Sequence, residues 1–378
     1  MKYKIVCIGD IHFGSMKLKE QLDHLSLFIN FLSNPDNIID LLVILGDYFD
    51  SKIILNSPTA IASLQFFQRV YEICKSRNIK FRIIKGTHDH DNNQLEAFRE
   101  FEKDDFFKIF TTCITEETLP GLQCLYCPEE NINFKTYQEK YIDYLCIDND
   151  IAFVHGTFDV FLPVKLEDNE FNLVYEYNII STHVNGPILA GHWHTHNQYK
   201  KLIYVGSYDR WKFNEEEDKG FGYVTIDTDT KEYVYEHIIN TLAINYHTFT
   251  INTSTINSID DIHKIIVSIT HIMGLDDNLK MKIKYIVDDV KDTNEVYLNT
   301  LKDYYSKNKR VKIIVRNLSE VKKKEEKKKA VFQDMSQYSF IFDKNKSISE
   351  IIHEYIMMYY NKDIDVEKIR SVIEKYIK

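Results

Sequence analysis

Five short apolar runs in the first 194 residues end next to side chains that bind metal ions well. Each run leads directly into an aspartate or a histidine, or into a glycine or threonine beside one. A lone Asp-x-His or His-x-His is more often surface or capping chemistry than a metal site. Five such segments in series are hard to obtain by chance. The segments are Asp10-Ile11-His12, Gly46-Asp47-Tyr48-Phe49-Asp50, Gly86-Thr87-His88-Asp89, His155-Gly156 and Gly191-His192-Trp193-His194.

The spacing of these apolar runs predicts an α/β fold. The runs have the length and composition of buried strands. Helical spacing predicts helices at Leu18–Leu32 and Pro58–Arg77, the second with Ser57 as its N-cap. Strand–helix–strand order implies a layered sheet whose functional groups gather at the carboxyl ends of the strands. The predicted strands are Lys4–Gly9, Leu41–Gly46, Phe81–Gly86, Ile151–His155 and Pro187–Gly191.

Carboxylates and imidazoles at several strand ends form the ligand set for two divalent ions. Alternate residues of an extended segment point the same way, so Asp10 with His12, and His192 with His194, can each offer two side chains to one site. Two ions about 3.5–4 Å apart can clamp the attacking and leaving oxygens of an in-line displacement at phosphorus. A carboxylate between the ions would offset their repulsion, and Asp47, in the middle of the set, is the expected bridge.

The pattern changes after about residue 230, where a compact β-α-β-α-β unit is predicted. Its strands are expected at Thr248–Asn252, Lys280–Val287 and Arg310–Val315, and its helices at Ile259–Met273 and Glu295–Lys307. The charged run at 320–329 indicates a solvated helix or linker, because glutamates interrupt its lysines. Residues 347–378 carry two apolar stripes at helical spacing and predict a helix pair that begins at a Ser347–Glu350 capping box. Such a pair packs back on the body or docks on a partner.

Composition limits the partners and the compartment. A net charge of −10 argues against binding nucleic acid by bulk charge, so any DNA affinity must come from local patches or a partner. The sequence has no membrane-length apolar run and no signal peptide at its N-terminus. A cytoplasmic protein is therefore expected, in the host cytoplasm if a phage or virus encodes it. The pair Cys124 and Cys127 is either a metal or redox site or, as we favour, two partly buried thiols.

The motif order DxH, GDxxD, GxHD, H, GHxH resembles the signature of calcineurin-like metallophosphoesterases, whose third motif is normally GNH followed by an acid. Within that superfamily the chain is similar to SbcD-type nuclease subunits of DNA double-strand-break repair, relatives of the eukaryotic meiotic-recombination-eleven nuclease. The segment Asp10-Ile11-His12-Phe13-Gly14 matches the DxHxG opening of that family. A PGS…R…F…KGF segment is also matched, by Tyr204-Val205-Gly206-Ser207, Arg210, Phe213 and Lys219-Gly220-Phe221. Motif resemblance covers about 1–225, and the rest matches in architecture alone.

This resemblance implies a sandwich of two sheets flanked by helices, a capping domain and a C-terminal helix pair. The expected domains are a nuclease domain at 1–230 and a capping domain for DNA recognition at 231–316. A charged linker at 317–346 and a helix pair at 347–378, which would bind an ATPase partner, follow.

The resemblance also implies the role of each site residue. Asp10, His12, Asp47 and His194 would hold one metal ion, and Asp47, His155 and His192 the second. His88 would be a catalytic histidine that binds no metal and instead stabilises the transition state or protonates the leaving oxygen. The expected ions are Mn²⁺, with Mg²⁺, Fe²⁺ or Zn²⁺ as alternatives.

One position departs from the family pattern, because Thr87 stands where the family has an asparagine ligand for the second ion. A hydroxyl is a shorter and poorer ligand than a carboxamide. Three alternatives follow: Thr87 binds through a water, a neighbour among Asp89, His90, Asp91 and Asn92 substitutes for it, or the second site is weak.

Three functions are therefore compared. The leading one is a DNA exonuclease and endonuclease subunit, a homodimer that acts with an SbcC-like SMC-type ATPase. A small-molecule or phosphoprotein phosphoesterase is the second, but the capping unit and the Lys219-Gly220-Phe221 segment argue against it. A scaffold that holds DNA ends and hardly cuts them is the third, and Thr87 is its only support.

Overall fold

The computed structural model describes residues 1–252 apart from 55, 88–91, 104, 163–172 and 214, and then 259–272, 281–288 and 311–315. A few single positions between 299 and 367 are described as well. The chain divides into two compact units. The first comprises Met1–Thr248 with Ile269–Lys284 and Lys309–Val311, and the second comprises Phe249–Ser268, Tyr285–Asn308 and Lys312–Lys378.

A six-stranded mixed sheet forms one half of the first unit. Its strands, in spatial order, are β14 (Tyr233–Ile239), β13 (Gly220–Asp227), β1 (Lys2–Ile8), β2 (Leu41–Ile44), β3 (Lys80–Ile84) and β4 (Phe107–Phe110). The strands β1 to β4 run parallel to one another, whereas β13 is antiparallel to both β1 and β14. The pairing of β14 carries this sheet past residue 230, where the sequence analysis placed a domain boundary.

A second six-stranded sheet forms the other half. Its order is β11 (Asn197–Tyr199), β12 (Leu202–Tyr204), β10 (Ile188–Gly191), β7 (Ile151–His155), β6 (Leu122–Cys127) and β5 (Ile114–Leu119). The four central strands are parallel, and the outer strands β5 and β11 are antiparallel to their neighbours. A short pair, β8 (Thr157–Phe158) and β9 (Val174–Tyr175), stands apart from it.

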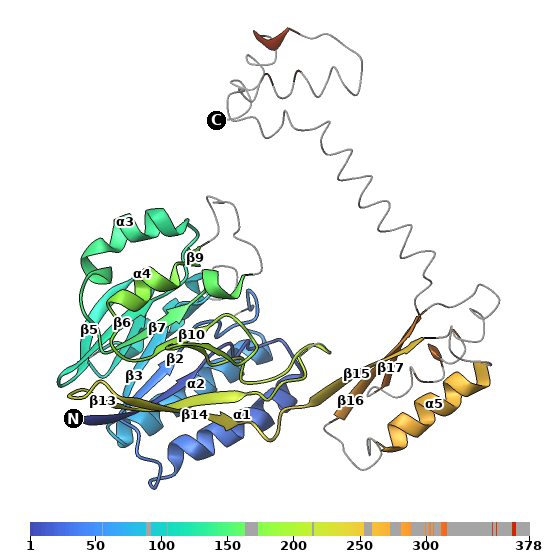
Figure 1. The fold of residues 1–378 in the computed structure, drawn as a ribbon. Coiled ribbons are helices and arrows are strands. Elements are labelled where there is room, and N and C mark those ends of the chain that lie inside the picture. The colour runs from blue at the N-terminus through green and yellow to red at the C-terminus, as the bar shows by residue number, and fades with distance from the viewer. Residues whose placement is uncertain are drawn as a thin grey trace. The chain divides into compact units, whose positions relative to one another are not determined.

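Four layers result, because side chains alternate between the two faces of each strand. Ile5 and Cys7 of β1 pack between the sheets, against residues such as Phe153 of β7. Val6 and Ile8 point the other way, into a core shared with α1 (Leu18–Ser33) and α2 (Pro58–Ser76). The second sheet packs its outer face on α3 (Phe134–Leu145) and α4 (Tyr177–Thr182). Figure 1 shows the two helix pairs on opposite sides of the sheets. The predicted fold class is confirmed.

Local signals in the sequence account for the helix ends. The hydroxyl of Ser57 accepts a hydrogen bond from the backbone N–H of Ala60 at 3.1 Å, so it caps α2 as predicted. Two 3₁₀ segments, Asn92–Phe101 and Asp159–Phe161, complete the helical elements of this unit in the described residues. None of the described helices is long and apolar enough to cross a bilayer.

The thiols of the CxxC pair do not share a site. Cys124 packs between the two sheets, whereas Cys127 points to the α3 side, where its sulfur lies 3.7 Å from that of Cys113. All three are buried and free. The expectation of buried thiols near a strand is confirmed.

The later described elements form a three-stranded sheet in the order β15 (Asn245–Asn252), β16 (Met281–Asp288) and β17 (Val311–Val315), with the helix α5 (Ile259–Ile272). The hydroxyl of Tyr285 donates to the carbonyl of Ile266 at 3.2 Å and so ties β16 to α5. These elements lie where the sequence predicted them. Most of the predicted helix at Glu295–Lys307, the charged linker and nearly all of the C-terminal helix pair lie outside the described residues.

Candidate metal centre

The predicted ligands come together where the carboxyl ends of parallel strands from both sheets meet. Asp10 and His12 follow β1, Asp47 follows β2, His155 ends β7, and His192 with His194 follows β10. Two hydrogen bonds join the sheets at this edge. The N–H of His192 donates to Asp10 Oδ1 at 2.9 Å, and His155 Nδ1 lies 2.6 Å from the carbonyl oxygen of Leu45.

The backbone at four of these ligands has a conformation that side chains rarely adopt. Asp10 has a φ of 51°, His12 of 47°, Asp47 of 47° and His192 of 91°. Positive φ at a residue other than glycine costs free energy, and it persists only where the surrounding structure imposes it. Such residues cluster at functional sites, so their coincidence with the predicted ligands supports a site here.

Two glycines permit the close approach of the segments. At Gly46, φ is +83°, and a Cβ would lie 2.4 Å from His155 Nδ1. At Gly86, a Cβ would lie 2.0 Å from the backbone nitrogen of Asp47. No side chain fits at either position, so the glycines in these motifs are needed for packing at the site.

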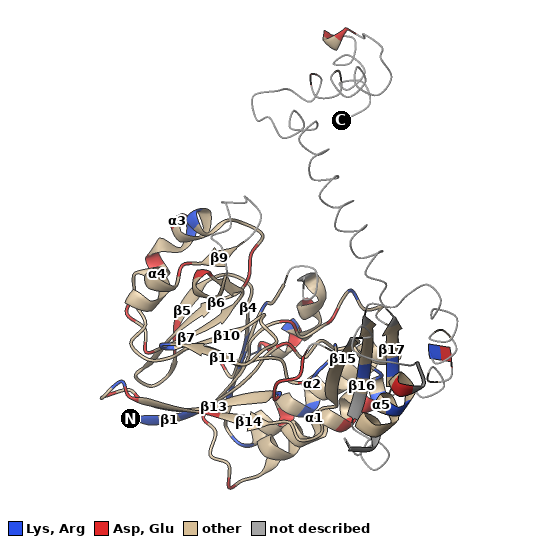
Figure 2. Ribbon diagram, turned by 45° about the vertical axis from the view of Figure 1, so that its right-hand side comes forward, with Lys and Arg blue, Asp and Glu red and all other residues tan. Residues whose placement is uncertain are grey.

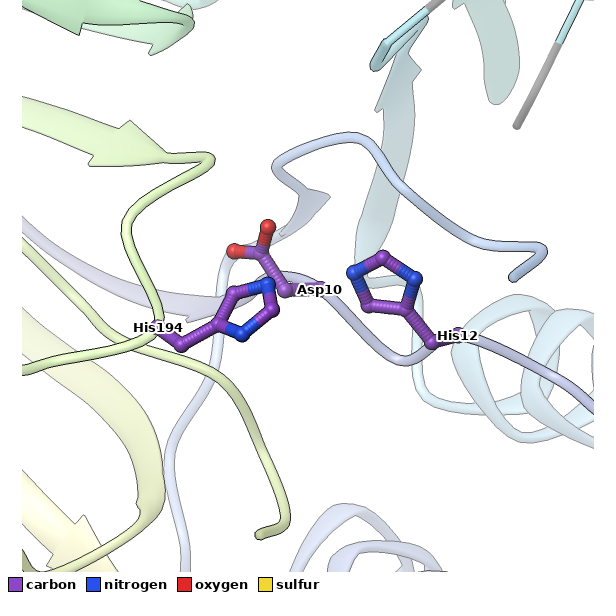
Figure 3. Close-up of side chains that lie close together, drawn as sticks. All are labelled: Asp10, His12 and His194. Atoms are coloured by element: carbon purple, nitrogen blue, oxygen red, sulfur yellow. The ribbon is translucent and has the colours of Figure 1, made fainter. Parts of the chain in front are cut away.

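Asp10, His12 and His194 form the first ligand group. One ligand atom from each lies within 4.8 Å of the others. Figure 3 shows the Asp10 carboxylate next to the ring of His194, with the ring of His12 facing both. His194 Nδ1 lies 3.2 Å from Glu215 Oε1, which leaves Nε2 for an ion. The ring of Trp211 lies edge-on to both imidazoles, at 4.4 Å from His12 and 4.5 Å from His194 between centroids.

Asp47, His155 and His192 form the second group under the same 4.8 Å condition. The contact of His155 Nδ1 with the Leu45 carbonyl fixes the ring and directs Nε2 toward Asp47 Oδ1, 3.3 Å away. The rings of His155 and His192 are 5.3 Å apart and nearly perpendicular. Two imidazoles and a carboxylate thus face one point.

The carboxylate of Asp47 lies between the two groups. Its Oδ1 faces His155, and its Oδ2 lies 3.6 Å from Nε2 of His12 in the first group. One oxygen is therefore available to each group, as a bridging ligand requires. Asp50 Oδ1 lies 3.5 Å from the other nitrogen of His12, where it can orient the ring.

Burial and mutual charge shift the protonation of these groups. Burial raises the pKa of Asp10 above its ordinary value, although the neighbouring His155 opposes the shift. Burial alone would lower the pKa of His155, but the charge and hydrogen bond of Asp47, together with the charges of Asp10 and Glu129, outweigh it and raise this pKa to about 10. Bound divalent ions would replace these protons, because metal ligands bind in their deprotonated forms.

The motif that departs from the family pattern lies beside the second group. The N–H of Thr87 donates to Asp47 Oδ1 at 2.6 Å, and its hydroxyl lies 3.4 Å from both His155 Nε2 and His192 Nδ1. The predicted catalytic residue His88 lies outside the described residues, as do Asp89, His90 and Asp91. Their predicted roles stay predictions.

Sequence reasoning missed Glu129, whose Oε2 lies 3.5 Å from His192 Nδ1. Glu129 follows the buried strand β6 after a single proline. It is thus a sixth case of an apolar run that ends near a ligand-type side chain. That signal was present in the sequence.

Two histidines outside these groups have other partners. His24 of α1 is buried and contacts the Asp209 carboxylate, as expected of a satisfied core histidine. His196 Nδ1 lies 2.8 Å from the carbonyl oxygen of Tyr204, and its ring stacks on Tyr235.

The donors fit two divalent ions, since four imidazoles and two carboxylates are placed as two groups joined by Asp47. Bound there, the ions would activate water and polarise a phosphoryl group. The protein side chains would fix the position of the ions, and the buried surroundings would strengthen their field.

Comparison with known proteins agrees with this chemistry. A search of curated proteins finds no match to the chain. Residues 3–224 match the protein family described as Calcineurin-like phosphoesterase. That match spans more than half of the 378 residues and includes both ligand groups. The chain therefore belongs to the calcineurin-like phosphoesterase family, whose members are metal-dependent phosphoester hydrolases.

Proposed function

We propose that this chain is the nuclease subunit of a DNA end-processing complex and hydrolyses phosphodiester bonds with two divalent ions, preferably Mn²⁺. The family match and the two ligand groups support a phosphoester hydrolase. The choice of DNA as the substrate rests on the segment that links the metal centre to the start of β15.

That segment, Ser207–Phe221, contacts both the proposed metal ligand His194 and the first residues of β15. Lys219 Nζ donates to the carbonyl of His194 at 2.6 Å. Arg210, which is buried, donates to Asn245 Oδ1 at 3.1 Å, and the hydroxyl of Thr248 donates to the Phe213 carbonyl at 3.1 Å. A hydrolase of small phosphate esters needs no such link to a further sheet and helix. A long polymeric substrate gives that extension a purpose.

The charge distribution defines how DNA would be held. Acidic and basic residues are interspersed along the described ribbon (Figure 2), and the net charge is −10. DNA is therefore not expected to bind through a uniformly basic surface. The proposed contacts with DNA are the bound ions and local basic groups. A partner subunit would supply further affinity.

The partner we propose is an SMC-like ATPase, bound by the helix pair at 347–378, with two copies of the chain in the complex. Two apolar stripes in a segment too short to bury them in a core of its own support this docking role. Deletion of 345–378 is expected to abolish pull-down of the ATPase. Retained binding would place the contact elsewhere.

Cleavage assays test the substrate. The chain with Mn²⁺ is incubated with linear duplex DNA, hairpin DNA and a chromogenic bis-phosphodiester, with Asp47→Ala as the matched inactive control. We expect metal-dependent cutting of DNA that Asp47→Ala lacks. Cutting of the chromogenic ester but never of DNA, even with the ATPase present, would contradict a nuclease and favour a small-molecule phosphoesterase. Metal-dependent cleavage of neither substrate would favour a scaffold.

A further inference from the structure

Glu129, which follows β6, lies beside the second ligand group. None of the five predicted motifs follows that strand. Its Oε2 lies 3.5 Å from His192 Nδ1 and 3.8 Å from His155 Nε2. Its side chain is 17% exposed, so it is held at the site and not in bulk solvent. Ligands that share one ion lie at separations of this order, since each is about 2.0–2.2 Å from the ion.

The hydroxyl of Thr87 joins Glu129 to Asp47. Thr87 Oγ1 lies 3.3 Å from Glu129 Oε2 and 3.2 Å from Asp47 Oδ2. A hydroxyl has one proton to donate, so it serves one carboxylate at a time. Two carboxylates that converge on this half-buried hydroxyl repel each other unless positive charge lies among them, from a protonated imidazole or from a bound cation.

We infer that Glu129 is a ligand of the second ion and takes the place of the carboxamide that the family pattern has at position 87. Thr87 then acts as a positioning residue, whose N–H and hydroxyl hold Asp47 and Glu129 in place. The inference rests on the two-ion hydrolase proposed above, but it does not depend on DNA as the substrate.

The added carboxylate changes the charge of the centre. The six predicted ligands carry two carboxylates, from Asp10 and Asp47, and Glu129 adds a third. When two divalent ions are bound, the net charge of the ions and their ligands is one unit lower than in a centre that has a neutral carboxamide. Carboxylate ligands suit Mn²⁺ and Mg²⁺. Relative to Zn²⁺, the second site should therefore bind these hard cations better than a site with a neutral carboxamide would.

Counting bound Mn²⁺ tests the inference without an activity assay. Equilibrium dialysis of the full chain should give two ions per chain. We expect Glu129→Ala to bind the second ion more than about 100-fold more weakly, since the loss of an outer hydrogen-bond partner usually costs about 10–100-fold in metal affinity. Glu129→Gln should fall between the two, because it keeps an oxygen ligand but loses the charge. It preserves the shape of the side chain and so guards against a folding defect.

The neighbouring carboxylate provides the matched control. Glu130 pairs with Lys140 at 2.7 Å and with the hydroxyl of Tyr141, and Glu130→Gln should leave both ions bound. Adding Thr87→Asn to Glu129→Ala should restore the second ion, because the carboxamide returns to the family position. Unchanged affinity in Glu129→Ala, or loss without rescue by Thr87→Asn, would overturn the assignment. Failure to cut DNA would leave the ion count intact and would contradict only the substrate proposal.

Discussion

The two ligand groups of the metal centre use the same kinds of residue but are supported in different ways. In the first group, His194 is backed by the carboxylate of Glu215 at 3.2 Å. In the second, His155 is backed by a backbone carbonyl, that of Leu45, at 2.6 Å. The second group also has Thr87 and Glu129 within 3.5 Å of His192 Nδ1, neither of which follows the family pattern.

This difference shows where the centre tolerates change. Trp211, Glu215 and Lys219 contact His194 of the first group, and all three lie in the Ser207–Phe221 segment. Thr87 and Glu129 of the second group follow β3 and β6, in segments where one ligand type can be exchanged for another without disturbing a strand. The first site is therefore expected to bind its ion as the family pattern implies. Ion binding at the second site is expected to depend on Thr87 and Glu129, which depart from that pattern.

The largest effect is expected at the residue that both groups share. Asp47→Ala should weaken both ions and lower metal-dependent hydrolysis by at least about 100-fold, since removal of a ligand exceeds the loss of an outer hydrogen bond. Metal content and initial rates on the chromogenic ester measure this. An Asp47→Ala variant that kept one ion at full affinity would show that the groups are independent.

Variants confined to one group should separate the two ions. His194→Ala is expected to lose the first ion and His155→Ala the second, each by at least about tenfold in affinity. Dialysis against Mn²⁺ gives the count for each variant. If both variants lost the same ion, the division into two groups would be wrong.

Gly86→Ala should disturb the second group by sterics alone. The new Cβ would lie 2.0 Å from the nitrogen of Asp47 and 2.3 Å from its Oδ1. Overpacking of this kind costs about 1–3 kcal/mol of stability. The melting temperature should fall, and the affinity of the second ion should fall more than that of the first, because the contact is with the Asp47 oxygen that faces the second group. An unchanged melting temperature would contradict the close approach of the two segments.

The smallest effect is expected at the support of the first group. Glu215→Gln keeps the size of the side chain but removes the charge that orients His194. Burial opposes that charge, but the hydrogen bond with His194 and the charge of Lys219 hold the pKa of Glu215 below its ordinary value. We expect about tenfold weaker binding of the first ion alone. If binding of the second ion weakened instead, Glu215 would support the second group and not the first.

The strands that lead into the candidate ligands, and the meeting of those residues at one edge of the sheets, were predictable from local pattern. Strands such as β7 are short apolar runs bounded by polar residues, and Asp10-x-His12 carries its chemistry in its own spacing. The role of Gly86 in admitting Asp47 was not predictable, because it depends on the parallel pairing of β2 with β3. The left-handed backbone at His192 is likewise imposed by tertiary contacts.

Glu129 was missed because its partners are remote in sequence. It meets His155 only because β6 pairs in parallel with β7, with Cys127 opposite Val154. The outer elements β4 and β5, and the hairpin of β13 with β14, were also missed, since their burial depends on neighbours that local pattern does not identify.

The most direct test of the two-ion account is a titration of the metal-free chain with Mn²⁺, in which bound ions and hydrolysis of the chromogenic phosphodiester are measured in the same samples. The account predicts that two ions bind per chain and that hydrolysis rises only as the second ion binds. Full activity with a single ion bound, or two bound ions with no hydrolysis of any phosphoester, would contradict it.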